Sequence, residues 1–247
     1  MSLLVALVHG GMDRASSFAK TTRVLTAGGF DVLAYDRPGY ASAVGDEPCT
    51  DVASAADDLL RRIDGRPAVA VGHSYGGHVA MLAAIRRPDL IGAVGVFETP
   101  YSWEPFWPDD TSGGTAVAVA DREGTEAAAE AFMRTLVGDR VWERLPSSTK
   151  ELRRAEGRAL VADLRSIQHA APYDPRDLPV PLVVGRGSKA LPHQAAGTDW
   201  ILEQVPDAEL VVIDGAGHGA HRSHPDDFAR FVERVAARAG EAGQTRA

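Results

Sequence analysis

A serine between glycines is the residue of this chain best suited to act as a nucleophile. Residues 72–76 read Gly-His-Ser-Tyr-Gly with Ser74 at the centre, after an apolar run at 68–71 and before a helical pattern at 78–86. G-x-S-x-G between a strand and a helix is typical of a nucleophile elbow, a tight turn that holds the serine hydroxyl clear of a sheet. Glycines two positions before and after the serine leave room for this strained turn. The alternative is a glycine-rich turn with an incidental serine, and the flanking elements favour the nucleophile.

Backbone amides near Ser74 are suited to stabilise negative charge on the oxygen of an attacked carbonyl. Tyr75 opens the helical pattern, so its N–H has no partner within the helix and can donate to such an oxyanion. A glycine pair follows the first apolar run and predicts a second amide from Gly11, with Met12 as the alternative. His9 precedes this pair, and we interpret it as a residue that shapes the loop by hydrogen bonding.

A general base must accompany Ser74, because a serine hydroxyl is a weak nucleophile at neutral pH. His218 stands on a glycine-rich loop after the last apolar run, in the order that places the base late in the chain. His221 and His224 follow at three-residue steps, which is also compatible with a metal site. Because no cysteine or carboxylate cluster stands beside these histidines, we predict no metal and assign the base to His218.

Short apolar runs alternate with longer helical patterns and predict the elements that position these residues. The runs lie at 3–8, 31–35, 68–71, 91–97, 181–184 and 209–213. Their near-continuous hydrophobicity is typical of strands buried on both faces of a parallel sheet. The alternation predicts an α/β fold with a mostly parallel sheet of about six strands and right-handed crossovers.

The segment 100–172 interrupts this alternation. It begins with an aromatic and proline-rich stretch, continues with Ala-, Glu- and Arg-rich helical patterns, and contains no convincing strand. A connection of this length is rarely a plain loop, so we expect a helical insertion. The predicted organisation is a core of residues 1–99 and 173–240, a helical cap at 100–172 and a disordered tail at 241–247.

Composition limits the partners that this protein can have. The chain has 247 residues, with 34 acidic and 26 basic side chains, and carries a formal charge of −8. This balance argues against nucleic acid or an anionic membrane surface, since both attract clustered Lys and Arg. One cysteine, Cys49, excludes an intrachain disulfide. The first apolar run is too short to span a bilayer and lacks signal-peptide features, so we expect a cytoplasmic protein. Nothing indicates an oligomeric state.

Taken together, these residues resemble the α/β-hydrolase family over nearly the whole chain. The segments that carry the resemblance are the oxyanion loop at 9–11, the following turn at 36–40, the elbow at 72–76 and the histidine loop at 215–218. The resemblance implies that 100–172 is the cap of that family. Family members usually begin with an antiparallel hairpin. Met1 stands directly before the first strand here, so we expect the hairpin to be missing.

The resemblance places the catalytic acid at an unusual position. The family usually carries it after the strand that follows the cap, in a Gly-x-x-Asp pattern, but Ser188 occupies that position here. Some members carry it at the end of the strand after the elbow helix, where Glu98 stands, and we assign the acid to Glu98. The alternative is a glutamate that caps the strand end or bonds the cap. Asp174, Asp199 and Asp214 are weaker candidates for the acid.

The expected activity is that of a serine hydrolase that cleaves an ester, thioester, lactone or amide through a Ser-His-Glu triad and an acyl-enzyme. No cofactor is expected, because no G-x-G-x-x-G pattern with a following acidic residue is present. The alternatives are lyase or cofactor-free perhydrolase chemistry at the same site, and a non-catalytic ligand-binding protein.

The beginning of the cap region predicts the surroundings of a small-molecule substrate. Four aromatic residues crowd it, close in sequence to Glu98: Tyr101, Trp103, Phe106 and Trp107. They predict an apolar wall for a hydrophobic acyl or aromatic group. An ordinary cap core is an equal alternative.

Overall fold

The computed structural model describes residues 3–245 and contains one six-stranded sheet in the order β2-β1-β3-β4-β5-β6. The strands are β1 (Leu4–Val8), β2 (Asp31–Ala34), β3 (Ala68–His73), β4 (Ile91–Phe97), β5 (Leu182–Gly187) and β6 (Glu209–Ile213). All five strand pairs are parallel, which confirms the predicted fold class.

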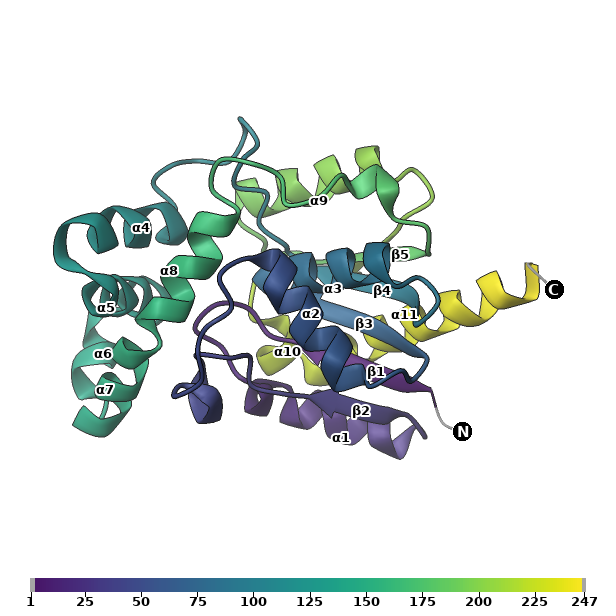
Figure 1. Cartoon of the computed structure of the whole chain (residues 1–247), viewed down its shortest axis with the longest axis horizontal. Coiled ribbons are helices and arrows are strands. Elements are labelled where there is room, and N and C mark those ends of the chain that lie inside the picture. The colour runs from purple at the N-terminus through teal and green to yellow at the C-terminus, as the bar shows by residue number, and fades with distance from the viewer. Residues whose placement is uncertain (1–2, 246–247) are drawn as a thin grey trace.

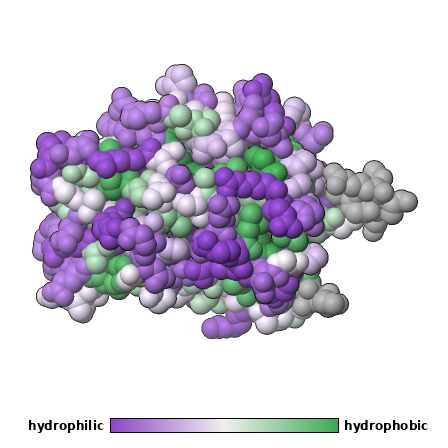
Figure 2. Space-filling view, in the orientation of Figure 1, coloured by the Kyte–Doolittle hydropathy of each residue, from purple (hydrophilic) through white to green (hydrophobic). Residues whose placement is uncertain are grey.

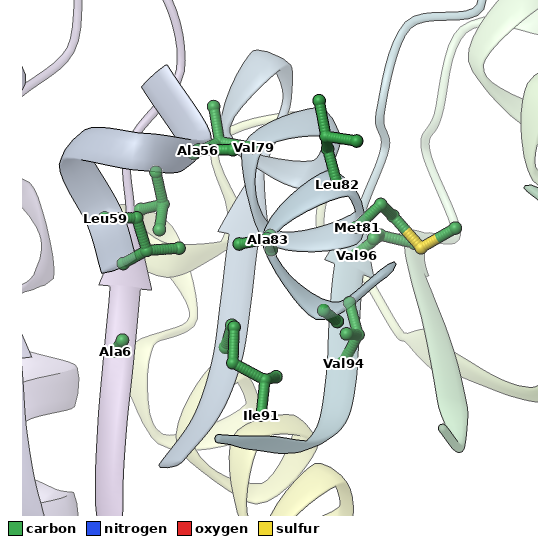
Figure 3. Packing of buried hydrophobic residues seen from close by; sticks show 14 of the residues in the cluster. Ala6, Ala56, Leu59, Val79, Met81, Leu82, Ala83, Ile91, Val94 and Val96 are labelled. Carbon is green, nitrogen blue, oxygen red and sulfur yellow. The ribbon is translucent and has the colours of Figure 1, made fainter. Parts of the chain in front are cut away.

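Helices cover both faces of this sheet, which explains why the strands read as continuous apolar runs. Leu4, Ala6 and Val8 of β1 belong to the core on one face, with α2 (Val52–Ile63), α3 (Tyr75–Arg86) and α9 (Pro192–Gln204). Val5 and Leu7 belong to the core on the other face, with α1 (Ala19–Ala27) and α11 (Pro225–Thr245). Figure 3 shows the first of these cores, where Leu59 and Val79 lie over the sheet residues Ala6 and Val94.

The order of the strands reverses direction at β1. This reversal creates a crevice at the carboxyl ends of β1 and β3. From β1 the chain passes to β2 on one side and then crosses to β3 on the other. The carboxyl ends of β1 and β3 lie side by side, with Val8 paired to Gly72. Ligands of open α/β sheets bind outside the carboxyl ends of the strands at such a switch point.

Five helices separate β4 from β5 and lie beyond the carboxyl ends of the strands (Figure 1). They are α4 (Ser112–Glu123), α5 (Thr125–Val137), α6 (Asp139–Arg144), α7 (Ser147–Ala155) and α8 (Gly157–Ser166). Buried side chains of these helices, such as Trp142 and Leu160, form a small cluster together with Met12 and Tyr40 from the loops after β1 and β2. The shorter elements of the chain are η1 (Ala15–Phe18), η2 (Ala41–Ala43), η3 (Pro175–Asp177) and α10 (Ala220–Ser223).

A buried carboxylate on α8 ties these helices to the sheet. Asp163 accepts hydrogen bonds from Arg37 Nη1 at 3.1 Å and from the Tyr40 hydroxyl at 2.6 Å. The Arg37 and Asp163 side chains are only 2% and 3% exposed. Two buried charges are stable only when they are paired and hydrogen-bonded. The turn after β2 therefore acts as the main polar anchor of α8.

The C-terminal segment differs from the expectation of a disordered tail at 241–247. Helix α11 continues to Thr245, so residues 241–245 are helical, and residues 246–247 lie outside the described part. Glu241 accepts hydrogen bonds from Arg234 at 2.9 Å and from Arg238 at 3.3 Å. These pairs between successive turns help the helix to continue.

One face of the protein is largely polar. On the face shown in Figure 2, hydrophilic residues dominate and hydrophobic residues appear in separate groups between them. No helix within residues 3–245 is both long and apolar enough to cross a membrane.

Candidate active site

Ser74 lies in the tight turn between β3 and α3, as the elbow pattern predicts. Its backbone has φ +54° and ψ −128°, a strained conformation for a residue with a side chain. The neighbouring glycines are required by close packing. A Cβ on Gly72 would lie 2.0 Å from the Gly76 carbonyl oxygen, and one on Gly76 would lie 2.1 Å from that of Val8. The Ser74 amide donates to the Phe97 carbonyl at 2.9 Å, so strand β4 also holds the turn in place.

His218 is oriented by Glu98. His218 Nδ1 donates to Glu98 Oε2 at 2.8 Å, and the Gly187 amide donates to Glu98 Oε1 at 2.8 Å. The Glu98 side chain is fully buried, whereas that of His218 is 35% exposed. With Nδ1 bonded to the carboxylate, Nε2 is the ring nitrogen of His218 that remains available as a base.

Ser74 and His218 line the same cavity. Within residues 3–245 no hydrogen bond joins Ser74 Oγ to His218. Such bonds are often long in unliganded enzymes and tighten when substrate binds. The arrangement therefore remains compatible with a serine–histidine pair.

The other carboxylates considered for the acid are engaged elsewhere. Asp214 accepts from the Ser188 hydroxyl at 3.0 Å, so both of these residues bond to each other and not to His218. Asp199 pairs with Arg186 at 3.1 Å. Asp174 pairs with its near neighbour Arg176. Among the described residues, Glu98 is the carboxylate that contacts the His218 ring.

Three backbone amides are available near Ser74 for an oxyanion. In the described part of the chain, the N–H groups of Gly11, Met12 and Tyr75 donate to no other protein group. Met12 has a positive φ of 55°, which reflects the sharp turn of this loop after β1. A Cβ on Gly10 would lie 2.8 Å from Ser74 Cβ, so the loop runs directly against the elbow.

His9 supports this loop through its ring. Its Nδ1 donates to the Gly10 carbonyl at 2.7 Å, and its Nε2 accepts from the Arg37 amide at 2.9 Å. Burial, aided by the charge of Arg37, lowers the pKa of His9 to about 3. The ring is therefore neutral near pH 7 and shapes the loop by hydrogen bonding, as interpreted from the sequence.

His73 connects the elbow to the histidine loop, a role that the sequence analysis did not identify. Its Nε2 donates to the backbone carbonyl of His218 at 2.7 Å. Burial, with the nearby charges of His221 and His218, holds the pKa of His73 well below its ordinary value. A neutral imidazole in this position fixes the backbone of the loop that carries His218. Its place directly before Ser74 in the sequence was the available signal.

A second group that the sequence analysis missed consists of Asp13, His73 and His221. His221 Nε2 donates to Asp13 Oδ2 at 3.0 Å. Burial opposes ionisation of Asp13, but this hydrogen bond and the charges of His221 and His73 hold the pKa of the carboxyl below its ordinary value. One ligand atom from each residue lies within 4.8 Å of the others, so the three are close enough to hold a metal ion. The three-residue steps from His218 to His224 do not form such a group within residues 3–245.

The cavity that contains Ser74 has a volume of about 840 Å³. Its apolar wall comes from α5, through Phe132, Met133, Leu136 and Val137. Basic side chains come from the residue directly before η1, from α1 and α10, and from α7.

The four aromatic residues predicted to form an apolar wall for the substrate, Tyr101, Trp103, Phe106 and Trp107, are not among the residues that line the cavity at Ser74. They pack near α3 and α9, the helices that cover one face of the sheet. Tyr101 is buried against Trp200, with ring centroids 4.6 Å apart. Trp103 packs against His78, and Trp107 packs against His193. Phe106 packs against the hydrophobic core that contains α2, α3 and α9. Aromatic side chains stabilise a fold most where they bury a large apolar area, and α9 offers a surface for this.

The parallel sheet, the strained serine turn and the histidine–carboxylate pair define a hydrolase of the α/β fold. A family model described as the alpha/beta hydrolase family matches residues 5–231, and the chain belongs to this family. It is 30% identical over 250 residues to a pimeloyl-[acyl-carrier protein] methyl ester esterase of Aromatoleum aromaticum, covering 94% of this chain and 97% of that protein.

The chain is similar to two further proteins of known name. The chain is 32% identical over 187 residues to a 2-hydroxymuconate semialdehyde hydrolase of Pseudomonas putida, which covers 68% of this chain and 62% of that protein. Among solved structures, the enol-lactonase from Burkholderia xenovorans superposes with a TM-score of 0.74 at 20% identity, covering 96% of this chain and 92% of the other. At that identity the structural likeness supports the fold alone.

Proposed function

We propose that the protein is a serine esterase that works through Ser74, His218 and Glu98 and an acyl-enzyme intermediate. The observation that carries this proposal is the 2.8 Å bond between the Glu98 carboxylate and His218 Nδ1, beside a serine held in a strained elbow. Esterase names among the relatives support an ester as the substrate.

The first half of the reaction transfers the acyl group to the enzyme. Ser74 Oγ attacks the carbonyl carbon while His218 Nε2 takes the hydroxyl proton. The carbonyl oxygen becomes an oxyanion, and the amides of Tyr75 and Gly11, or of Met12, donate to it. When the carbon–oxygen bond to the alcohol breaks, His218 returns the proton to the leaving alkoxide, and Ser74 holds the acyl group as an ester.

The second half releases the acid. A water molecule gives a proton to His218 and attacks the acyl carbon. The Ser74 oxygen then leaves and regains the proton, so the products are the alcohol and a carboxylic acid. Throughout both halves, Glu98 stabilises the imidazolium form of His218 and holds its Nδ1–H away from the serine. The mechanism needs no cofactor.

We propose further that residues 100–172 form the cap of this site, over a core of residues 1–99 and 173–240. Helix α5 contributes the apolar wall of the cavity, and α8 is tied to the core through Asp163. A cap of this kind excludes water and limits which esters reach Ser74.

Active-site labelling tests the proposal. A fluorophosphonate probe is expected to label Ser74 alone, with loss of esterase activity, and Ser74→Ala should neither be labelled nor hydrolyse nitrophenyl acetate. Ser188→Ala is the matched control, because its hydroxyl bonds to Asp214 and not to the site, and it should label normally. Labelling that persists in Ser74→Ala would refute the proposed nucleophile. Labelling without hydrolysis of any ester would favour lyase, perhydrolase or binding functions.

A further inference from the structure

The cavity at Ser74 is lined by more basic than acidic residues, although the protein as a whole has an excess of acidic residues. The chain carries 34 acidic and 26 basic side chains. Five of the basic residues line this cavity but only one acidic residue does, Asp13. The basic residues are Arg14, Lys20, Arg23, Arg153 and Arg222. The cavity therefore concentrates positive charge on a negatively charged molecule.

Two of the five cations are already paired with a carboxylate. Arg14 and Arg153 both contact Glu156, at 3.5 and 2.8 Å, and Glu156 is fully buried. The acidic residue of the cavity, Asp13, is bonded to His221. Glu156 and Asp13 thus bond to Arg14, Arg153 and His221, and not to the other three cations of the cavity.

The other three cations have no acidic partner. Within residues 3–245 no carboxylate pairs with Lys20, Arg23 or Arg222, and all three side chains are exposed. An unpaired cation at the wall of a cavity can bind an anionic group without first breaking an ion pair.

These three residues come from elements that lie next to one another. Lys20 and Arg23 stand three positions apart on α1, so their side chains share a face of that helix. Arg222 is on α10, which packs against η1 directly before α1. The apolar wall on α5 belongs to the same cavity, as do Ser74 and His218. One molecule in the cavity could thus contact a cationic region, an apolar wall and the serine.

We infer that the substrate is an ester that carries a second, negatively charged group, a carboxylate or a phosphate, which Lys20, Arg23 and Arg222 bind while Ser74 attacks the ester. The inference rests on the proposed esterase function and adds the chemical class of its substrate. The apolar part of such a molecule lies against α5. Cations that line a cavity focus the field and attract anions more strongly than isolated surface charges do.

Matched pairs of esters test this inference. One series consists of mono-nitrophenyl esters of dicarboxylic acids of increasing length, a second of nitrophenyl esters that end in a phosphate, and a third of neutral nitrophenyl alkanoates of equal length. We expect kcat/KM for at least one charged series to exceed the neutral series by about tenfold at low salt, a difference of about 1.4 kcal/mol. The preference should lie in KM and shrink at 1 M salt, where the Debye length falls to about 3 Å. The two charged series show whether carboxylate or phosphate is preferred.

Charge-removing variants assign the effect to the three residues. The combined Lys20→Ala, Arg23→Ala and Arg222→Ala variant should lose the preference, so that its kcat/KM values for charged and neutral esters of equal length become similar. The control removes three exposed cations outside the cavity, Arg122→Ala, Arg140→Ala and Arg144→Ala, which changes the net charge equally and should retain the preference.

A binding measurement separates this inference from the proposed function. Calorimetry with Ser74→Ala should detect glutarate monomethyl ester, and the binding should weaken about tenfold when the three cations are also removed. If the wild type hydrolyses charged and neutral esters equally well, or if the control variant loses the preference as well, the inference is wrong although the esterase proposal stands. If the wild type hydrolyses no ester but Ser74→Ala binds the anion, the esterase proposal fails and the anion site remains.

Discussion

His218 Nδ1 lies 2.8 Å from Glu98 Oε2, although the two residues stand 120 positions apart in the chain. The same carboxylate also accepts from the Gly187 amide. Three segments at the carboxyl ends of β4, β5 and β6 thus meet at one buried side chain.

Glu98→Gln should lower turnover by roughly four orders of magnitude, as the equivalent change does in a well-built triad. The Gly187 amide would hold the glutamine oxygen, so the glutamine NH₂ would face His218 Nδ1. His218 would then place its proton on Nε2, where it cannot accept one from Ser74. Steady-state kinetics on a nitrophenyl ester checks this, with Asp199→Asn as a control that leaves turnover nearly unchanged. Near-normal turnover in Glu98→Gln would exclude Glu98 as the acid.

Asp163→Asn should destabilise the protein by about 3–5 kcal/mol, because it leaves the buried Arg37 guanidinium without its counter-charge. Urea unfolding followed by circular dichroism measures the change. Asp174→Asn is the control, since it removes a carboxylate from the exposed pair with Arg176 and should cost at most about 1 kcal/mol. Equal effects of the two changes would show that the Arg37 pair does not anchor α8.

The free energy of unfolding should fall as the pH is lowered below about 6.5. Burial lowers the pKa of His9 to about 3 and that of His78 to about 4, from an ordinary value of 6.5. Between these values the unfolded chain binds a proton that the folded protein does not, so each histidine lowers stability by about 1.4 kcal/mol per pH unit. At pH 8 both rings are neutral in both states and the effect is absent.

Urea titrations at pH 8, 6 and 5 test this dependence. His78→Gln removes one titrating ring, so the slope of stability against pH between 6 and 5 should decrease by about 1.4 kcal/mol per pH unit. The comparison uses slopes, so a constant loss of stability in the variant does not affect it. An unchanged slope would mean that His78 titrates alike in the folded and unfolded protein.

Chelation should leave turnover unchanged, although Asp13, His73 and His221 are close enough to hold a metal. Asp13 Oδ2 already accepts from His221 Nε2 at 3.0 Å, so two of the atoms that a metal ion would need are bonded to each other. Activity after treatment with EDTA, together with metal content by mass spectrometry, checks this. Activity that disappears with EDTA and returns with zinc would contradict it and identify these three residues as a metal site.

Local patterns in the sequence were sufficient to predict the fold class, and they identified Ser74 and His218 as the candidate nucleophile and base. A strand buried on both faces needs a continuous apolar run, and a strained serine turn needs glycines two positions away on each side. Both requirements act between neighbours in the chain, so they can be read from the sequence alone. The same reasoning located Glu98 as a candidate but could not choose among the carboxylates, because that choice depends on contacts between distant segments.

Tertiary packing decided which residues line the cavity at Ser74. The aromatic residues at 101–107 are as hydrophobic as a pocket wall requires, but α9 offers them a larger buried surface, and Tyr101 packs there. The cavity is lined instead by α5 and by cations from α1 and α10, which lie about 200 residues apart in the chain. His73 and Asp13 were likewise identified only when β1 and β3 came together. A sequence shows which side chains are available, whereas the charge and shape of a cavity depend on which distant elements the fold brings to one place.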